Sequence, residues 1–259
     1  MTRNETLNTI KSLRSTHWTF NDKPVSKEAV ETIVRHSMRA ANSDNLTDYS
    51  VVVIDDPEVI NLITDGESEG KPCTCLLYFI DHTRIIQYAR TLGYNDFTPL
   101  NRLYNFFISV ADVNVAAQTA IIAAKSMGID SLCTNFPQRS HPKRLMEMLG
   151  MPKEYCFPIM AVVLGYSDAP AEQTTGRLDA KHIIHHGKYH HADTAEIQEM
   201  ITEMDAVYPQ YINDKYKHAL DWYFNEWFIE WHNEDVYREL VECWLESGLI
   251  DEPMFCLKQ

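Results

Sequence analysis

Five histidines between residues 182 and 191 form the densest cluster of side chains that could do chemistry in this sequence. Neutral imidazoles are common ligands of zinc and related metals, so the cluster allows a metalloprotein or a metal-dependent hydrolase. No Cys-x-x-Cys pair accompanies it, because only one residue separates Cys73 from Cys75. The alternative is a surface loop on which histidines gather without a ligand, and we expect no metal here. The five residues are His182, His185, His186, His190 and His191.

The sequence lacks two common nucleotide-binding motifs. It has no phosphate-binding G-x-x-x-x-G-K-S/T loop and no G-x-G-x-x-G dinucleotide motif. A Cys/His nucleophilic pair stays open, since 6 Cys and 11 His are present and no pattern singles out two of them. We therefore name no catalytic residue.

Composition narrows the class of protein. Among 259 residues, 37 are acidic and 23 are Lys or Arg, a formal net charge of -14. This charge repels nucleic-acid backbones and anionic bilayers, so we expect neither a nucleic-acid nor a membrane partner. No apolar run reaches the roughly 20 residues of a membrane span, and the first residues lack the apolar core of a signal peptide. Six cysteines are too few for a disulfide scaffold, so we expect a cytoplasmic protein with reduced thiols.

The hydrophobic pattern predicts helices around a few buried strands. Short apolar, mostly β-branched runs predict strands at 50–54, 76–80 and 159–164, with a further one around 131–133. Helical spacing predicts helices at 5–13, 27–39 and 101–127, capped by Asn4, Ser26 and Gly128. The helix at 101–127 is apolar on nearly every face of its second half, which indicates a central, buried position. After a polar linker at 167–180, residues 194–247 read as two or three helices rich in Trp and Tyr.

Two N-terminal segments carry a family pattern. Residues 14–17 read Arg-Ser-Thr-His and precede Phe20 and Pro24, while residues 41–47 read Ala-Asn-Ser-Asp-Asn-Leu-Thr before the strand at 50–54. The chain here resembles the FMN-dependent nitroreductase family, in which R-S-x-R precedes F-x-x-x-P and A-P-S-x-x-N-L-Q precedes a valine-rich strand.

Further segments resemble this family in the same order. They are Asp81 to Arg84 after a strand, Asp112 to Gly128 as the central D-x-x-x-A-A-Q helix, Leu149 to Pro152 with Leu164 to Tyr166, and Arg177-Leu178 before the stretch 184–189. Each match is weak, but their order over residues 6–189 makes the combination strong. The tail is similar to that of the larger, flavin-reductase-like subgroup.

Several positions depart from the family pattern. His17 stands at the second basic position, Asn42 replaces the usual Pro, and Thr47 replaces the usual Gln. Thr175 replaces a basic residue, and the segment at Asn135 lacks an expected glycine pair. These departures leave a second hypothesis open, namely a non-catalytic flavin- or ligand-binding protein on the same fold.

The resemblance implies a fold class and an assembly. We expect an α+β protein with a three-layer α/β/α nitroreductase-like fold, a mostly antiparallel central sheet and a C-terminal helical extension. Residues 1–190 would form the FMN-binding domain, and residues 191–259 would form the extension, packed on the same domain or on a partner. The family is homodimeric, with FMN at the subunit interface.

The resemblance also implies an activity and a set of ligands. We expect an oxidoreductase that takes two electrons from NADH or NADPH and passes them to a small organic acceptor such as a nitroaromatic, quinone or flavin. Arg14 and Arg177 would hold the FMN phosphate, because a guanidinium matches phosphate oxygens bidentately and stays charged. The other residues that we expect to bind the cofactor are Ser15, Thr16, His17, Ser43, Asn45 and Leu46.

Overall fold

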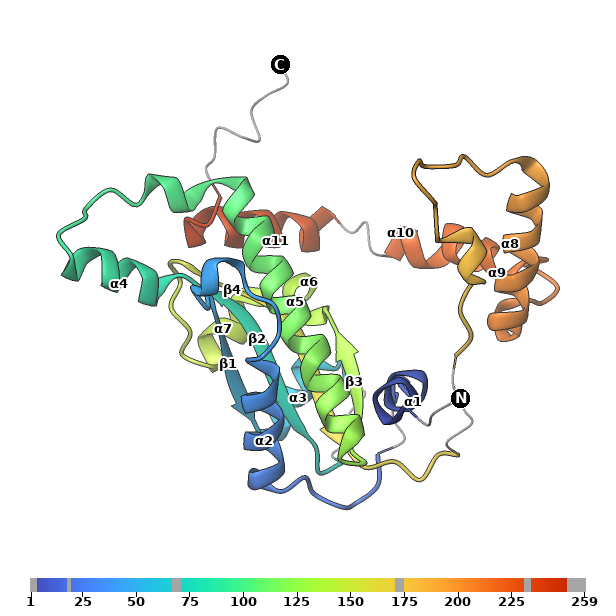
Figure 1. The fold of residues 1–259 in the computed structure, drawn as a ribbon, viewed down its shortest axis with the longest axis horizontal. Helices are drawn as coiled ribbons and strands as arrows, with labels where there is room; N and C mark the ends of the chain where they lie inside the picture. Colours follow the sequence, from blue (N-terminus) through green and yellow to red (C-terminus); the bar gives the residue numbers. More distant parts are fainter. Residues whose placement is uncertain (1–3, 18–19, 67–70, 171–174, 231–233, 251–259) are drawn as a thin grey trace. The chain divides into compact units, whose positions relative to one another are not determined.

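A computed structural model describes residues 4–17, 20–66, 71–170, 175–230 and 234–250 (Figure 1). The chain divides into two compact units, the first formed by Met1–Gln173 with Asp235–Gln259 and the second by Thr174–Glu234. This division differs from the expected one after residue 190. The second unit begins earlier, and the last helix belongs to the first unit.

A four-stranded antiparallel sheet forms the centre of the first unit, in the order β1-β2-β4-β3. Its strands are β1 Tyr49–Ile54, β2 Thr74–Asp81, β3 Asp130–Thr134 and β4 Cys156–Gly165. All residues of β2 and nearly all of β4 are buried. Because helices cover both faces of these strands, they are continuous apolar runs rather than alternating ones.

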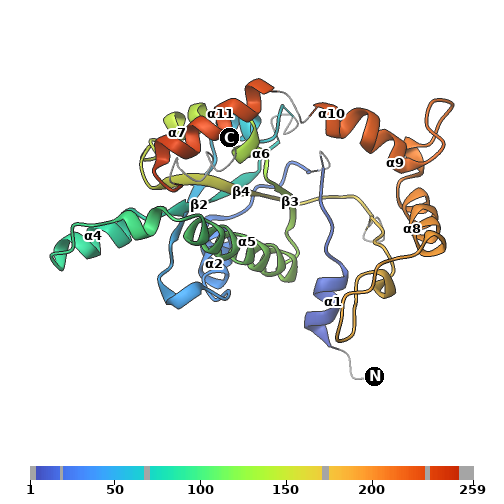
Figure 2. The ribbon, with the colours of Figure 1, turned by 90° about the horizontal axis from the view of Figure 1, so that it is seen from above.

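Two helices cover one face of the sheet, α2 Lys27–Ser37 and α5 Leu103–Ser126 (Figure 2). Asn4 caps the short α1 Glu5–Lys11 by accepting the Leu7 N–H, and Ser26 caps α2 by accepting the Ala29 N–H. On α5, buried alanines allow a close approach to the strands. Among the described residues, α5 is the one helix long and apolar enough to cross a membrane, yet its inner face is part of this core.

Helices α6 Phe136–Arg139, α7 Pro142–Met148 and α11 Glu234–Ser247 lie on the other side of the sheet (Figure 2). Helix α3 Pro57–Ile63 contacts α7. The Trp244 ring of α11 packs on Phe106 and Phe157, with ring centroids 5.7 and 5.8 Å apart. This aromatic contact joins the end of the chain to the first unit. The remaining helix of this unit, α4 Thr83–Thr91, is followed by the short turn η2 Thr98–Asn101 and then by α5.

The second unit is a small helical body. It contains η3 Ala180–His182, α8 Thr194–Val207, η4 Pro209–Tyr211, α9 Ala219–Trp222, η5 Tyr223–Trp227 and α10 Phe228–Glu230. A capping box of Asp193 and Glu196 starts α8. Stacked aromatic rings join η4 to α9. The ring centroids of Tyr211 and Trp222 are 4.3 Å apart.

The expected α+β class, the antiparallel sheet and the helical C-terminal extension are confirmed. The predicted strands and the helices at 5–13, 27–39 and 101–127 are present, each with ends shifted by a few residues. The sequence analysis did not identify α3, α4, α6 and α7, which are short.

Candidate functional site

The N-terminal segment 14–17 lies along the outer edge of β3. The Thr16 N–H donates to the Ser131 carbonyl at 2.9 Å, and Ser15 forms a parallel bridge with Ser131. Thr16 is buried, whereas Ser15 and His17 are exposed. Partial burial of the imidazole lowers the pKa of His17 below its ordinary value of 6.5. At this edge, the exposed Ser15 hydroxyl faces solvent.

Arg14, the first residue of this segment, directs its side chain toward protein partners rather than toward solvent. Its guanidinium donates to the Asp130 carboxylate at 3.2 Å and to the carbonyls of Ala169 and Pro170. Lys125 donates to the other Asp130 oxygen at 2.8 Å. Burial raises the pKa of Asp130, but the hydrogen bonds from Lys125 and Arg14 outweigh it and lower the net pKa. Arg14 therefore already serves a buried ion pair, and its role as a phosphate ligand stays a prediction.

The turn at residues 42–47 is the second part of the expected site. Its central residues form η1 Ser43–Asn45, and Asp44, Asn45 and Leu46 are exposed. Three of its residues that are not glycine have positive φ angles, at 50°, 56° and 53° for Asp44, Asn45 and Thr47. Such angles are uncommon for residues with a Cβ, and strain of this kind concentrates at functional sites. The turn thus presents an amide and an apolar side chain on a strained backbone.

In one chain, the turn and the N-terminal segment contact α5 at different points. Asp112 of α5 binds the turn, whereas Lys125 of α5 contacts the Asp130 partner of Arg14. At a rise of about 1.5 Å per residue, Asp112 and Lys125 are about 20 Å apart along the helix. The structure therefore brings Ser15, Thr16 and His17 together, and Ser43, Asn45 and Leu46 together, but it does not join the two groups.

Arg177 lies in the second unit. Its side chain is exposed and donates to the nearby carbonyls of Thr175 and Gly176 at 3.2 and 2.9 Å. Within the described ranges, no carboxylate pairs with it. An exposed guanidinium without an acidic partner suits a phosphate.

The histidine cluster of the second unit contains one compact group of ligand-type atoms. His182 Nε2 lies 3.3 Å from a Glu203 oxygen and 3.9 Å from a Glu199 oxygen, and the three ligand atoms lie within 4.8 Å of one another. However, Lys181 already pairs with Glu199, and the Asp179 N–H donates to Glu203 at 2.9 Å. The lysine supplies the positive charge that a metal would bring, so the absence of a metal stays our prediction.

A buried group of Asp48, His82 and Ser109 contains the residue types of a serine-hydrolase triad. The Ser109 hydroxyl donates to Asp48, and His82 Nε2 lies 2.8 Å from the same hydroxyl. All three residues are at most 6% exposed, so no substrate reaches the hydroxyl. The arrangement is also unsuitable for a triad, because the imidazole does not lie between the carboxylate and the serine. This group is a core polar network.

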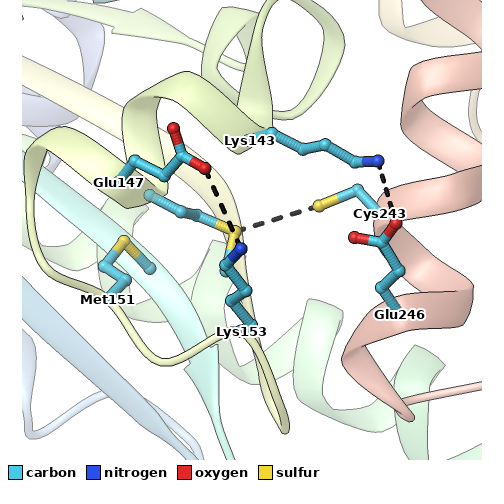
Figure 3. A pocket seen from close by; sticks show the side chains of 7 residues that line it. Lys143, Glu147, Met151, Lys153, Cys243 and Glu246 are labelled. Atoms are coloured by element: carbon cyan, nitrogen blue, oxygen red, sulfur yellow. Dashed lines mark hydrogen bonds and ion pairs between the residues drawn. The ribbon is translucent and has the colours of Figure 1, made fainter.

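Two hollows of the first unit differ in what they could hold. One lies between α7 and α11, with Lys143, Glu147, Met151, Cys243 and Glu246 around it (Figure 3). Its volume is about 50 Å³, which is too small for a flavin. The other is a shallow depression near the start of α5, largely open to solvent. It is lined by Asp96, Pro99, Arg102, Tyr104 and Asn105.

The residues present suit the chemical parts of FMN. Arg177 offers a guanidinium for the phosphate, and Ser15 and Ser43 offer hydroxyls for phosphate or ribityl oxygens. Asn45 offers an amide for the polar edge of the ring, and the exposed Leu46 offers an apolar contact for its face. The orphaned buried atoms Arg14 Nε and Thr16 Oγ1 border the same N-terminal segment. The residue types therefore suit the parts of FMN, and their assembly around one cofactor stays a prediction.

Sequence reasoning did not identify the residues that support this site. Asp130, Asp112 and Arg84 hold its segments in place, and two of them stood in the family motifs without a role. Their partners are distant in the chain, as with the 70 positions between Asn42 and Asp112. A charged residue within an otherwise apolar helix was the available signal for Asp112.

Comparison with known proteins shows a match to one family over part of the chain. Residues 74–166 match the model of the nitroreductase family. This range runs from β2 to the end of β4 and contains Arg84 and Asp112, but it contains none of the expected FMN ligands. The match therefore supports the core of the fold and leaves the ligand assignment as a prediction.

Curated relatives and solved structures agree with the match. The chain is 25% identical over 202 residues to a Cr(VI) reductase of Pseudomonas sp. (strain G-1), covering 76% of this chain and 79% of that protein. It is 27% identical over 208 residues to an NADPH-dependent oxidoreductase of Staphylococcus aureus (strain USA300), covering 76% and 78%. The NADPH:FMN oxidoreductase of Vibrio harveyi, solved with NAD⁺, superposes with a TM-score of 0.76 at 23% identity, covering 96% and 100%. Nitroreductase A of Vibrio parahaemolyticus superposes with a TM-score of 0.69 at 24% identity, covering 80% and 87%.

Proposed function

Since this chain is a relative of the nitroreductase family and has its fold, we propose that it is an FMN-dependent NAD(P)H oxidoreductase that reduces a small organic acceptor. The observation that carries the proposal is the family match over residues 74–166. The curated relatives are named as reductases or NADPH-dependent oxidoreductases, which supports NADPH or NADH as the electron donor.

When bound, FMN would supply the redox chemistry, accepting a hydride equivalent and passing two electrons on. The chain's own residues would bind and orient it. Ser15 and His17 would hold the phosphate end, while Asn45 and Leu46 would border the ring. Arg177, in the second unit, stays a separate prediction for the phosphate. No acid or base of this chain is required at the reacting atoms, and we assign none.

We also propose that the working form is a homodimer. The side of α5 that faces away from the sheet exposes Tyr104, Phe107 and Val115, at 74%, 60% and 40% of their surface. Their spacing places them along one stripe of the helix. A second copy on this stripe would bury it, and it would also supply the turn at 42–47 to the partner's N-terminal segment. Within one chain, the turn at 42–47 and the N-terminal segment 14–17 contact α5 at points about 20 Å apart.

The acceptor would be small and planar. Nitroaromatics, quinones and free flavins all have a flat ring that can stack on the ring of the bound flavin.

The purified protein tests this proposal directly. We expect a yellow protein with a flavin spectrum, or one that takes up about one FMN per chain. Under anaerobic conditions, NADPH or NADH should bleach the flavin, and a quinone or nitroaromatic should restore the colour. A protein that binds no added FMN would refute the proposal.

The second candidate function is a non-catalytic flavin-binding protein, favoured by the departures at Thr47, Thr175 and Asn135. It would bind FMN and keep its colour when either nicotinamide is added. The bleaching experiment therefore separates the two candidates.

A further inference from the structure

The turn at 42–47 keeps a strained backbone although much of it faces solvent. Asp44, Asn45 and Thr47 all have φ near +50°. Thr47 is β-branched, and for such a residue this conformation is a genuine outlier. Strain of this kind persists only where surrounding contacts over-determine the backbone.

The first of these contacts comes from α5. One oxygen of the buried Asp112 carboxylate accepts hydrogen bonds from the Asn42 side-chain amide at 2.8 Å and from the Ser43 N–H at 2.9 Å. The oxygen of the Asn42 side chain accepts the Thr47 N–H at 2.9 Å. Asn42 therefore closes the turn from its first residue to its last, and Asp112 anchors that closure to the core.

The second contact comes from α4. Arg84 donates to the carbonyls of Thr47 and Tyr49 at 2.8 and 2.7 Å. Its other terminal nitrogen donates to Ser50 at 2.6 Å and to Asp81 at 3.0 Å, so the guanidinium cannot rotate freely. Asp112 thus holds the start of the turn, and Arg84 holds its end.

These contacts also explain the departure from the family motif at Asn42. Asn42 stands where the pattern has Pro, and Thr47 stands where it has Gln. Proline restricts the backbone by its ring, whereas Asn42 restricts it by a side-chain bridge to Thr47. In this chain the turn is rigid by a different chemical means.

We propose that Asp112, Asn42 and Arg84 are positioning residues of the flavin site, which hold the strained turn so that Ser43, Asn45 and Leu46 meet the cofactor. The inference rests on the proposed function. None of the three touches FMN in this account, and each acts through the turn.

The test compares Asp112→Ala with Asp112→Asn. The alanine leaves the Asn42 amide and the Ser43 N–H without an acceptor, so the turn relaxes and FMN affinity falls at least about tenfold. The asparagine keeps an oxygen at the same place, and its amide faces Asp48, which neighbours Asp112 in the parent. Asp112→Asn should therefore bind FMN within about twofold of the parent. FMN affinity is measured by quenching of flavin fluorescence, well below the melting temperature of every variant.

Thr74→Val is the matched control. Thr74 donates to Asp55 at 2.7 Å, and Asp55 follows the opposite end of β1 from the turn. Loss of this Thr74–Asp55 hydrogen bond in Thr74→Val should lower the melting temperature and leave FMN affinity unchanged. A merely structural role of Asp112 would give the same result as this control, with stability lost and affinity kept, and it would overturn the inference.

Two further outcomes keep the inference testable. If Asp112→Ala does not fold, Asn42→Ala takes its place, because it removes the bridge to Thr47 from a partly exposed position. Equal FMN affinity in Asn42→Ala and the parent would overturn the inference. Failure of the parent to bind FMN would instead refute the proposed function, so the two failures are distinguishable.

Discussion

The guanidinium of Arg14 and the carboxylate of Asp130, 116 positions apart in the chain, form a buried ion pair at 3.2 Å. The two side chains are 8% and 9% exposed. The pair joins the N-terminal segment to the start of β3. In this chain Arg14 is therefore expected to matter for stability as well as for the cofactor.

Arg14→Ala should lower the free energy of unfolding by about 1–3 kcal/mol, because it removes a buried donor while Asp130 keeps Lys125. Denaturant unfolding of the cofactor-free protein measures this. The control is Lys71→Ala, which breaks the more exposed Lys71–Asp22 pair at 3.0 Å and should change stability by less than about 0.5 kcal/mol. Equal stabilities of Arg14→Ala and the parent would show that the ion pair contributes nothing.

Arg177 should act on the phosphate alone. Arg177→Ala removes one charge-assisted contact and should weaken FMN binding about 10- to 150-fold, without a change in melting temperature. Riboflavin lacks the phosphate and should bind the variant and the parent equally. Arg177→Lys should recover part of the affinity, because it keeps the charge and loses the bidentate geometry.

A matched variant for Arg177 is Lys217→Ala, which removes an exposed cation of the same unit. It should leave FMN affinity unchanged. If Arg177→Ala and Lys217→Ala weaken FMN binding equally, the effect is one of general charge and Arg177 is not a phosphate ligand.

The sheet and the central helix could be predicted because their signals are local. Leu76, Leu77 and Ile80 lie in one apolar run, and all three are completely buried in β2. The apolar residues of α5 likewise predicted a buried helix, and Ala116, Ala117, Ala120 and Ala124 lie on its buried face. Helices α4 and α7 were not predicted, since each is short and mixes charged with apolar residues.

The supports of the candidate site could not be predicted, because they depend on contacts between distant segments. Nothing local to Arg14 indicates that Asp130 would engage it. The division of the chain into two units also depends on a contact between distant segments. Helix α11 belongs to the first unit, where Trp244 contacts Phe157. The sequence shows Asn42 only as a departure from the family motif. Its structural role depends on a hydrogen bond to Asp112, which is 70 positions away in the chain.

The exposed stripe of α5 predicts the oligomeric state. We expect a stable dimer that buries more than about 2,000 Å² in total, as obligate interfaces do. Val115→Arg places a charge on the stripe and should give monomers in sedimentation velocity at low micromolar concentration. Tyr237→Arg, on the exposed side of α11, should remain dimeric. A parent protein that sediments as a flavin-loaded monomer would contradict the dimer.

The histidine cluster predicts no dependence on metal. Lys181 neutralises Glu199 beside His182, so chelation should change neither the melting temperature nor the reductase activity. Elemental analysis should find no stoichiometric metal in the purified protein. Zinc or iron at one atom per chain, with activity lost on chelation, would contradict this expectation.

Asp112 predicts a particular dependence of stability on pH. Burial and the nearby charge of Asp48 raise the pKa of Asp112 above its ordinary value of 3.8, although the Ser43 N–H acts in the opposite direction. A carboxyl group whose pKa is higher in the folded state binds more protons there than in the unfolded chain. Its contribution to stability therefore falls as the pH rises from about 3.8 through the folded-state pKa, and it is constant above that range.

Asp112→Asn isolates this contribution, because the amide does not titrate and the other carboxylates are shared with the parent. The difference in unfolding free energy between Asp112→Asn and the parent should move in favour of the variant as the pH rises from 4 toward neutrality. Urea unfolding at a series of pH values measures it, and Thr74→Val, which changes no titrating group, should differ from the parent by a constant amount. If the difference for Asp112→Asn is also independent of pH, or moves in favour of the parent, then Asp112 does not carry a raised pKa in the folded protein.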